Sequence, residues 1–461
     1  MTKAIYAIAE FCHRLSYAEL PPEIIDKVKL LVMDVFGNLI AGRNCQSSDI
    51  LSDYTVAQGG TAEATLVGSK IKYPAANVVL ANCAMAHSLD YDDTHNASCV
   101  HMGAAIVPSA LAVVEKEGGT ARDFITAIVA GAEIAARVGV FLNPQGLYAR
   151  GYHPSCLCNP FGVAAAIGKL LRLTPDQIVN AFGLAGLQSF GLLRAHEKGA
   201  LSWYFQYARA AQSGIYAAYL ARAGLTGPAG ILEGNGDKAW LASIHNPEAD
   251  ARLLTEGLGK GFALKGLSFK LRSCLHFGQA STDALLQVLQ DNQLSYTDID
   301  KIHLHLPSTA FNIIDATGYP ATPTDAQASP RYIMAVAAID RKVSPAQFTQ
   351  ERVSDNSLRQ FAQHVRLSAD KTLDDFFPAC WPALVDVTTK DGKSYSCLVK
   401  NARGDADNPP SLSEIQEKFR GLASGLLKTE RSEALLEQLN TLESMDDMCS
   451  LAQTLSEVEL P

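Results

Sequence analysis

Helical periodicity across the first 265 residues restricts the fold of this chain more than any other feature. In residues 22–42, apolar side chains recur at three- and four-residue spacings after a pair of prolines, and Gly42 ends the pattern. Comparable patterns predict helices over residues 75–88, 103–117, 121–138, 160–171, 175–187 and 205–223. Residues 162–168 and 208–214 are rich in small side chains, which let helix backbones approach closely. We therefore predict a large helical domain with crowded central helices.

The pattern changes near residue 266. Residues 302–306 alternate like a strand, with His303 and His305 on one face, where we expect them to meet solvent or an interface. Residues 383–399 are typical of a hairpin with an Asp-Gly turn. Helices that would cover one face of this small sheet are predicted over residues 276–290, 330–340 and 355–365. This stretch is predicted to be an α+β insert.

Helical patterns return after residue 404, over residues 412–423 and 431–442, and we expect these helices to pack back on the first domain. The predicted fold class is mainly α with an α+β insert. A large all-helical domain would be built from both chain ends, residues 1–265 and 404–461, and residues 266–403 would form the smaller α+β domain.

Charge and hydropathy exclude several classes of protein. The net charge of −9 argues against nucleic-acid binding, which needs clustered Lys and Arg. The longest apolar run, residues 103–114, is shorter than the roughly 20 residues of a membrane span, and the start of the chain lacks a signal-peptide cleavage site. We therefore expect a cytoplasmic protein that binds no membrane, and its ten cysteines are expected to be reduced thiols.

Residues 87–102 combine three aspartates and three histidines with several hydroxyls. Groups that exchange protons near neutral pH are the requirement of acid/base catalysis, so this stretch is where we expect the chemistry. Two other interpretations remain open for it. An Asp-rich turn at a helix end can be only a cap and a solvated loop, and an Asp/His cluster can bind the metal of a hydrolase, although the spacing here matches no standard helix-based ligand pair, so no metal site is predicted.

Several motifs in a fixed order resemble the MmgE/PrpD superfamily over nearly the whole chain. They are His87-Ser-Leu-Asp-Tyr-Asp-Asp-Thr-His95 with His101, Gly151-Tyr-His-Pro154, Ala181-Phe-Gly-Leu-Ala-Gly-Leu-Gln-Ser189, Ala210-Ala-Gln-Ser-Gly214 and Lys270 to Cys274. The resemblance implies the same two-domain fold, a homodimer, an active site between the domains and no metal or organic cofactor. It also implies a lyase or isomerase that performs dehydration, decarboxylation or epimerisation at a carbon next to the carboxyl or imine group of a small organic acid.

The resemblance also assigns site residues. His101 and His153 would be the catalytic proton-transfer pair, and Asp90 would orient an imidazole or a substrate hydroxyl. Lys270 would hold a substrate carboxylate. The further candidates for substrate binding are Thr94, Asp93, His95, Trp203, Gln206 and Arg272.

The chain departs from the family pattern at a few of these positions. Trp203 and Gln206 stand where many members have a lysine and a histidine, and Gln279 stands at another histidine position. Replacing a cation by tryptophan removes a carboxylate anchor and adds apolar surface. Two alternatives follow. The first is a diverged member that acts on a less charged, bulkier substrate, and the second is a member that has lost catalysis and serves as a binding or assembly protein.

Overall fold

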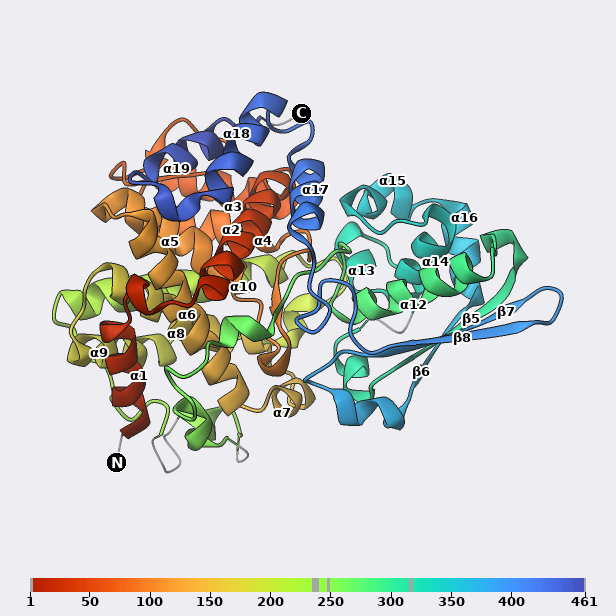
Figure 1. Cartoon of the computed structure of the whole chain (residues 1–461), viewed down its shortest axis with the longest axis horizontal. Helices are drawn as coiled ribbons and strands as arrows, with labels where there is room; N and C mark the ends of the chain where they lie inside the picture. Colours follow the sequence, from red (N-terminus) through yellow and green to blue (C-terminus); the bar gives the residue numbers. More distant parts are fainter. Residues whose placement is uncertain (1–2, 234–239, 247–248, 315–317, 460–461) are drawn as a thin grey trace.

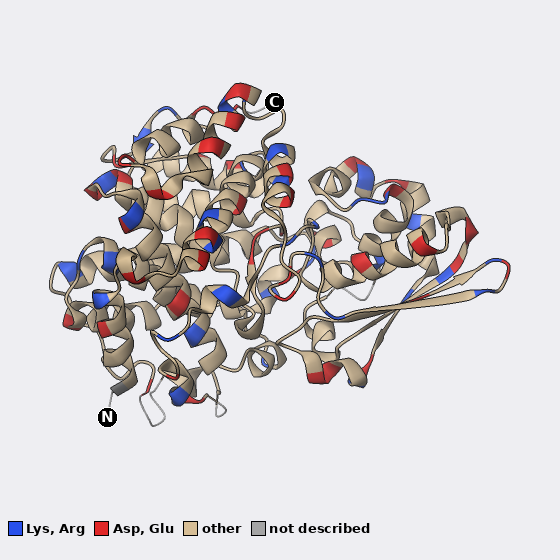
Figure 2. Ribbon diagram, viewed as in Figure 1, with Lys and Arg blue, Asp and Glu red and all other residues tan. Residues whose placement is uncertain are grey.

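The computed structural model describes residues 3–233, 240–246, 249–314 and 318–459. Figure 1 shows two domains side by side, with both chain ends in the helical one. Two hydrophobic clusters form their cores, one built mainly from residues 4–269 and 415–458 and one mainly from residues 274–402. Basic and acidic residues, coloured blue and red on the ribbon of Figure 2, are interspersed along both domains. The mainly α architecture with an α+β insert is as predicted, and the boundaries at residues 266 and 403 stay a prediction.

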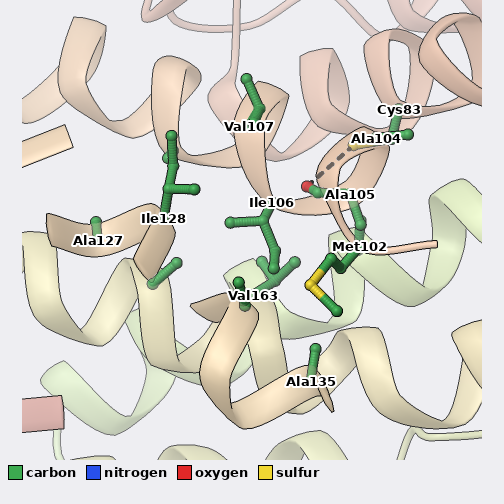
Figure 3. Packing of buried hydrophobic residues seen from close by; sticks show 14 of the residues in the cluster. Cys83, Met102, Ala104, Ala105, Ile106, Val107, Ala127, Ile128, Ala135 and Val163 are labelled. Atoms are coloured by element: carbon green, nitrogen blue, oxygen red, sulfur yellow. Dashed lines mark hydrogen bonds between the residues drawn. The ribbon is translucent and has the colours of Figure 1, made fainter. Parts of the chain in front are cut away.

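The helical domain is packed around α6 and α8. A Cβ added to Gly131 of α6 would lie 2.7 Å from the carbonyl oxygen of Gly162 on α8, so only glycine permits this crossing. In Figure 3, Ile106 of α5, Ile128 of α6 and Val163 of α8 fill the space between these helices. The helices are α1 Lys3–Arg14, α2 Pro22–Gly42, α3 Gln46–Gln58, α4 Ala75–His87, α5 Gly103–Glu117, α6 Ala121–Phe141, α7 Pro144–Ala149, α8 Pro154–Leu170, α9 Pro175–Gly186, α10 Ser202–Arg222 and α11 Trp240–Ser243.

Helix α6 is long and apolar enough to cross a membrane by length and composition alone. Of its most apolar stretch, however, 89% is buried inside the protein. A central helix that is apolar on every side is the expected composition for a core surrounded by other helices.

The second domain is a four-stranded sheet with helices on one face. The strands follow the order β6-β5-β7-β8, in which only the β5–β6 pair is parallel. Helices α12 Phe277–Asp291 and α14 Pro330–Asp340 pack on it, and His303 and His305 lie on the other face. The strands are β5 Ile299–Leu306, β6 Val365–Ala369, β7 Ala383–Thr389 and β8 Ser394–Val399, and the short helices are α13 Pro323–Gln327, α15 Gln350–Val353 and α16 Asn356–Phe361.

The C-terminal segment returns to the helical domain, as predicted. Helices α17 Leu412–Ala423 and α18 Thr429–Asn440 pack on α2, and α19 Cys449–Ser456 packs on α5. In Figure 1 these blue helices lie beside the red and orange helices of the N-terminal half. The last segment of the chain therefore completes the core that the first segment begins.

Two predicted helices have different bounds in the structure. Helix α8 begins at Pro154 and not at Pro160, because His153 and Pro154 form an N-cap and N1 pair and the burial of residues 154–168 tolerates the inner proline. The helix predicted over residues 355–365 ends at Phe361, and residues 365–369 instead pair with β5 as strand β6. Pairing with β5, a nonlocal interaction, makes residues 365–369 a strand and not the end of a helix.

Two short ladders of two residue pairs each complete the fold of the described residues. Strand β3 Thr94–His95 pairs antiparallel with β4 Leu267–Ser268, and β1 Ala64–Thr65 pairs with β2 Lys72–Tyr73. The β3–β4 ladder joins the Asp/His stretch to the segment that leads into the second domain. It thereby fixes that stretch at the boundary between the two cores.

Candidate active site

A cavity of about 420 Å³ lies where the two domains meet. This volume is in the usual range for a small-molecule site. The helical domain supplies Asp90, His101, His153 and Trp203 to its wall, and the second domain supplies His276. The other lining residues are Tyr148, Leu193, His196, Glu197, Lys198, Leu275, Phe277, Asn312, Ile313, Ile314, Asp325, Ala328 and Trp381.

His101 is held in one orientation by its Nδ1 atom. That nitrogen lies 2.8 Å from the backbone oxygen of Asp93 and 3.0 Å from Oγ1 of Thr94. Because a carbonyl oxygen only accepts, Nδ1 carries the proton, and Nε2 is left unprotonated in the neutral ring. Burial, together with the charge of Lys270, lowers the pKa of His101 to about 4. The ring is therefore neutral at pH 7 with a basic nitrogen available.

The loop that carries His101 is anchored to the first turn of α5 by Asp93. Its carboxylate accepts the backbone N–H groups of Met102 and Gly103 at 3.1 and 2.9 Å. Negative charge is favourable at a helix N-terminus, where the amides have no intrahelical partner. Burial, together with the neighbouring charge of Asp92, nevertheless raises the pKa of Asp93 to about 7. Asp93 thus positions the loop and does not line the cavity.

His153 is the N-cap residue of α8, and its ring faces the same cavity. The ring centres of His101 and His153 are 6.4 Å apart. Nδ1 of His153 lies 3.1 Å from the thiol of Cys156, and its backbone N–H donates to Gly191 at 3.0 Å. Burial holds the pKa of His153 well below its usual value, so this ring is also neutral at pH 7. Two imidazoles separated by 52 positions in the chain therefore meet at one cavity.

His87 is buried behind these two rings. Its Nδ1 lies 2.8 Å from a carboxylate oxygen of Asp92, while its Nε2 accepts a hydrogen bond from the indole N–H of Trp203 at 3.1 Å. The ring stacks on Tyr207 with centres 4.0 Å apart. His87 therefore orients the Trp203 indole, whose ring centre lies 4.2 Å from that of His153.

Asp90 and Lys270 form an ion pair at the cavity. The Lys270 side chain is fully buried and donates to both the carboxylate and the backbone oxygen of Asp90. Burial alone would lower the pKa of Lys270, but the charges of Asp90 and Asp92 raise it above its usual value, so the ammonium keeps its proton. Asp90 has a φ of +46°, a strained conformation for a residue with a Cβ, and this ion pair holds it there.

A second buried lysine supports the first from the C-terminal segment. Lys418 on α17 donates to Asp34 of α2 at 2.6 Å and to the backbone oxygens of Tyr91 and Lys270 at 2.5 and 2.9 Å. One ammonium group thus ties α2, α17, the Asp/His loop and the Lys270 segment together. The position of the Asp90–Lys270 pair depends on this contact.

Comparisons with known proteins decide the family. Residues 6–249 match the MmgE/PrpD N-terminal domain, and residues 273–443 match the MmgE/PrpD C-terminal domain. The chain belongs to the MmgE/PrpD family. It is 25% identical to a cis-aconitate decarboxylase-like protein of Aspergillus oryzae, over 97% of each chain. It is 24% identical to a cis-aconitate decarboxylase of Aspergillus terreus, over 97% of this chain and 95% of the relative, and 23% identical to that of Homo sapiens, over 97% and 93%.

Of the site residues that the MmgE/PrpD resemblance assigned, the structure brings Asp90, His101, His153 and Trp203 to the cavity wall. Lys270 and Thr94 stand directly behind it, bonded to Asp90 and His101 respectively. The others contact protein groups away from the cavity wall: Asp93 at the start of α5, His95 on Ser98, Gln206 on the Leu192 backbone, and Arg272 on Asp283. These four side chains do not line the cavity, and their contact with substrate stays a prediction.

Two cavity histidines were missed by the sequence reasoning. His276 is buried, and its Nδ1 has no hydrogen-bond partner among the residues that the structure describes. It lies three residues before Gln279, the position at which the resemblance leads us to expect a histidine, and it lies at the start of the predicted helix over residues 276–290. His196 packs edge-on against Trp203 with ring centres 4.9 Å apart, and its short 3-10 turn, Leu193–His196, carries no periodicity that would single it out.

The protonation of His101 can be tested in the free protein. With its pKa lowered to about 4, the ring should remain neutral and protonated at Nδ1 from pH 5 to pH 8. We expect the ¹⁵N shifts of His101, measured on histidine-labelled protein, to show the Nδ1–H tautomer and no titration in that range. A midpoint near 6.5, or the Nε2–H tautomer, would contradict this geometry; a His101→Gln sample assigns the signal.

Proposed function

We propose that this chain is a lyase that acts on a small organic acid, with His101 and His153 as its proton-transfer pair. The observation that carries the proposal is their convergence, with ring centres 6.4 Å apart at one cavity between the domains. The family and the cis-aconitate decarboxylase relatives support lyase chemistry.

In this proposal His101 is the general base. Its proton is fixed on Nδ1 by the Asp93 carbonyl, so its Nε2 lone pair is available for a proton of the substrate. The lowered pKa keeps the ring neutral, and therefore able to accept a proton, at every pH above about 4. Removing a proton next to a carboxyl group leaves enolate-like charge, which the ammonium of Lys270, paired with Asp90 beside the cavity, would partly offset.

His153 is proposed as the general acid. In a dehydration, His101 takes the proton from the carbon, the carbon–oxygen bond of the neighbouring hydroxyl breaks, and His153 donates a proton so that water leaves as the double bond forms. The ring is neutral in the free protein, and a bound substrate carboxylate would favour its protonated form. The thiol of Cys156 can hydrogen-bond Nδ1 and leave Nε2 directed to the substrate.

A decarboxylation would use the same groups in a different order. Carbon dioxide leaves, the electrons of the broken carbon–carbon bond remain on the substrate, and a protonated histidine supplies the proton that replaces the carboxylate. An epimerisation would return the proton to the opposite face of the carbon, so an isomerase remains the alternative within this chemistry. We further propose that the reaction needs no metal ion, because the described groups supply both the base and the acid.

The test is turnover and isotope exchange. Purified protein incubated with organic acids in deuterated water, with and without a chelator, should release water or carbon dioxide and place deuterium on the reacting carbon, and the chelator should change the rate less than twofold. Racemised substrate with no loss of water or carbon dioxide would identify an isomerase instead. The lyase proposal fails if neither turnover nor exchange occurs across dehydratable and decarboxylatable acids.

A further inference from the structure

The charge on the cavity wall does not suit a polyanion. Among the described lining residues, Asp90, Glu197 and Asp325 carry carboxylates, and Lys198 carries the one ammonium group. The ammonium of Lys270, behind the wall, is already paired with Asp90. A substrate with three carboxylates would bring three more negative charges to this wall, and each needs a cationic or N–H partner when it leaves water.

Three of the four lining histidines do not offset this charge in the free protein. Burial lowers the pKa of His101 to about 4 and holds those of His153 and His276 well below the usual value. These three rings are neutral at pH 7. The wall therefore presents neutral donors and acceptors that can receive one carboxylate. Among the described residues, it has no surplus of cationic groups for further carboxylates, because Lys270 is paired with Asp90 and Arg194 with Glu197.

The other half of the wall is apolar. Leu275, Phe277 and Trp381 from the second domain are buried and line the cavity, with the Phe277 and Trp381 ring centres 4.5 Å apart. Ile313 and Ile314 extend this surface. On the helical side, the Trp203 indole has its N–H bonded to His87, so it offers the cavity its ring and no free donor. An apolar group buried here gains roughly 25 cal/mol for each Å² removed from water.

We propose that the site takes an acid with a single carboxylate and an apolar alkyl or aryl substituent, and discriminates against tricarboxylates. The carboxylate and reacting carbon lie at His101 and His153, and the substituent lies against Phe277 and Trp381. This proposal rests on the lyase function proposed above for its chemistry, but the binding preference can be measured independently. A cavity of about 420 Å³ has room for an acid of the size of a phenylpropanoate.

Binding can be followed by intrinsic fluorescence, because Trp203 and Trp381 line the cavity and are two of the three tryptophans in the chain. The probes are 3-phenylpropanoate and propane-1,2,3-tricarboxylate, neither of which can be dehydrated. We expect the monocarboxylate to bind with a Kd at least tenfold lower, which corresponds to about 1.4 kcal/mol. Equal affinities, or tighter binding of the tricarboxylate, would overturn the proposal.

Turnover provides the second measurement. With 3-hydroxy-3-phenylpropanoate, His101 would take a proton from C2, the C3–O bond would break with a proton from His153, and cinnamate and water would form. We expect kcat/KM for this acid to exceed that for cis-aconitate decarboxylation at least tenfold. A higher value for cis-aconitate would overturn the substrate class and leave the lyase function standing. If no acid is turned over, the lyase proposal fails, and the two binding constants still decide the preference.

Trp203→Lys adds a cation to the wall and should reverse the preference, with the tricarboxylate then binding more tightly by at least tenfold. The matched control is Phe205→Lys, two positions later on the same helix, where the side chain is 47% exposed and does not line the cavity. That variant adds the same charge and should keep the wild-type preference. Reversal in both variants would show a general charge effect and overturn the role of the wall. The wild-type Kd ratio decides the proposal even if Trp203→Lys does not fold.

Discussion

Replacing His101 by glutamine is expected to lower kcat/KM for any acid that the protein turns over by about 10²- to 10⁴-fold. The reason is that the variant lacks the basic Nε2 nitrogen. The backbone contacts of residue 101 do not depend on its side chain: its N–H donates to Ser155 at 3.0 Å, and its carbonyl accepts from Asn159 and Tyr207 at 2.9 and 2.8 Å. The fold should therefore persist, as measured by circular dichroism and a thermal midpoint close to that of the wild type.

His303→Gln is the matched control, since it removes an imidazole from the face of the sheet that α12 and α14 leave uncovered, away from the cavity. Its kcat/KM should equal that of the wild type. If the folded His101→Gln protein keeps wild-type activity, His101 is not the base. If the wild-type protein turns over no acid, and cells that carry the folded His101→Gln variant behave like wild-type cells, the binding or assembly alternative gains support.

Replacing Lys418 by methionine is expected to destabilise the fold by about 3–5 kcal/mol, because it leaves the carboxylate of Asp34 in the interior without its cation. Burial already raises the pKa of Asp34 to about 6, against the lowering effect of Lys418, and removing the lysine should raise it further. The variant must then keep Asp34 protonated or bury a charge. Its loss of stability in urea unfolding should therefore be larger at pH 8 than at pH 5.

Adding Asp34→Asn to Lys418→Met removes the buried charge and should recover part of the lost stability. The control is Lys393→Met, which breaks an exposed ion pair with Asp391 at the hairpin turn and should leave the urea midpoint unchanged. A Lys418→Met protein as stable as the wild type, with no pH dependence, would show that Lys418 does not support the core.

Most of the fold could be predicted because the local signals were strong. The Asp-Gly turn of the β7–β8 hairpin has Gly392 at a φ of +85°, and the hydroxyl of Thr174, a residue type typical of N-caps, caps α9. Strand β6 could not be predicted, since five residues after a helix become a strand only through pairing with β5. The predicted start of helix α8 at residue 160 is wrong. Pro160 lies inside the helix, because the burial around it outweighs the loss of one backbone hydrogen bond.

The site was only partly predictable, for a related reason. The family motifs point to Asp90, His101 and His153, which do line the cavity. A sequence motif does not show in which direction a side chain points or which group it contacts. Asp93 turns to the first amides of α5 and Arg272 turns to Asp283, whereas His276 turns into the cavity from the other domain. These choices depend on tertiary packing, and a single sequence does not reveal them.

The contact of Lys418 with Asp34 has a consequence for biosynthesis. The ribosome makes residue 418 after more than nine tenths of the chain, yet this side chain ties α2 to the Lys270 segment. A nascent chain can thus form most of its helices while the Asp90–Lys270 pair is still without its support. Chains that stop before α17 should be inactive and poorly folded, because Asp34 and the Lys270 segment then lack the Lys418 ammonium.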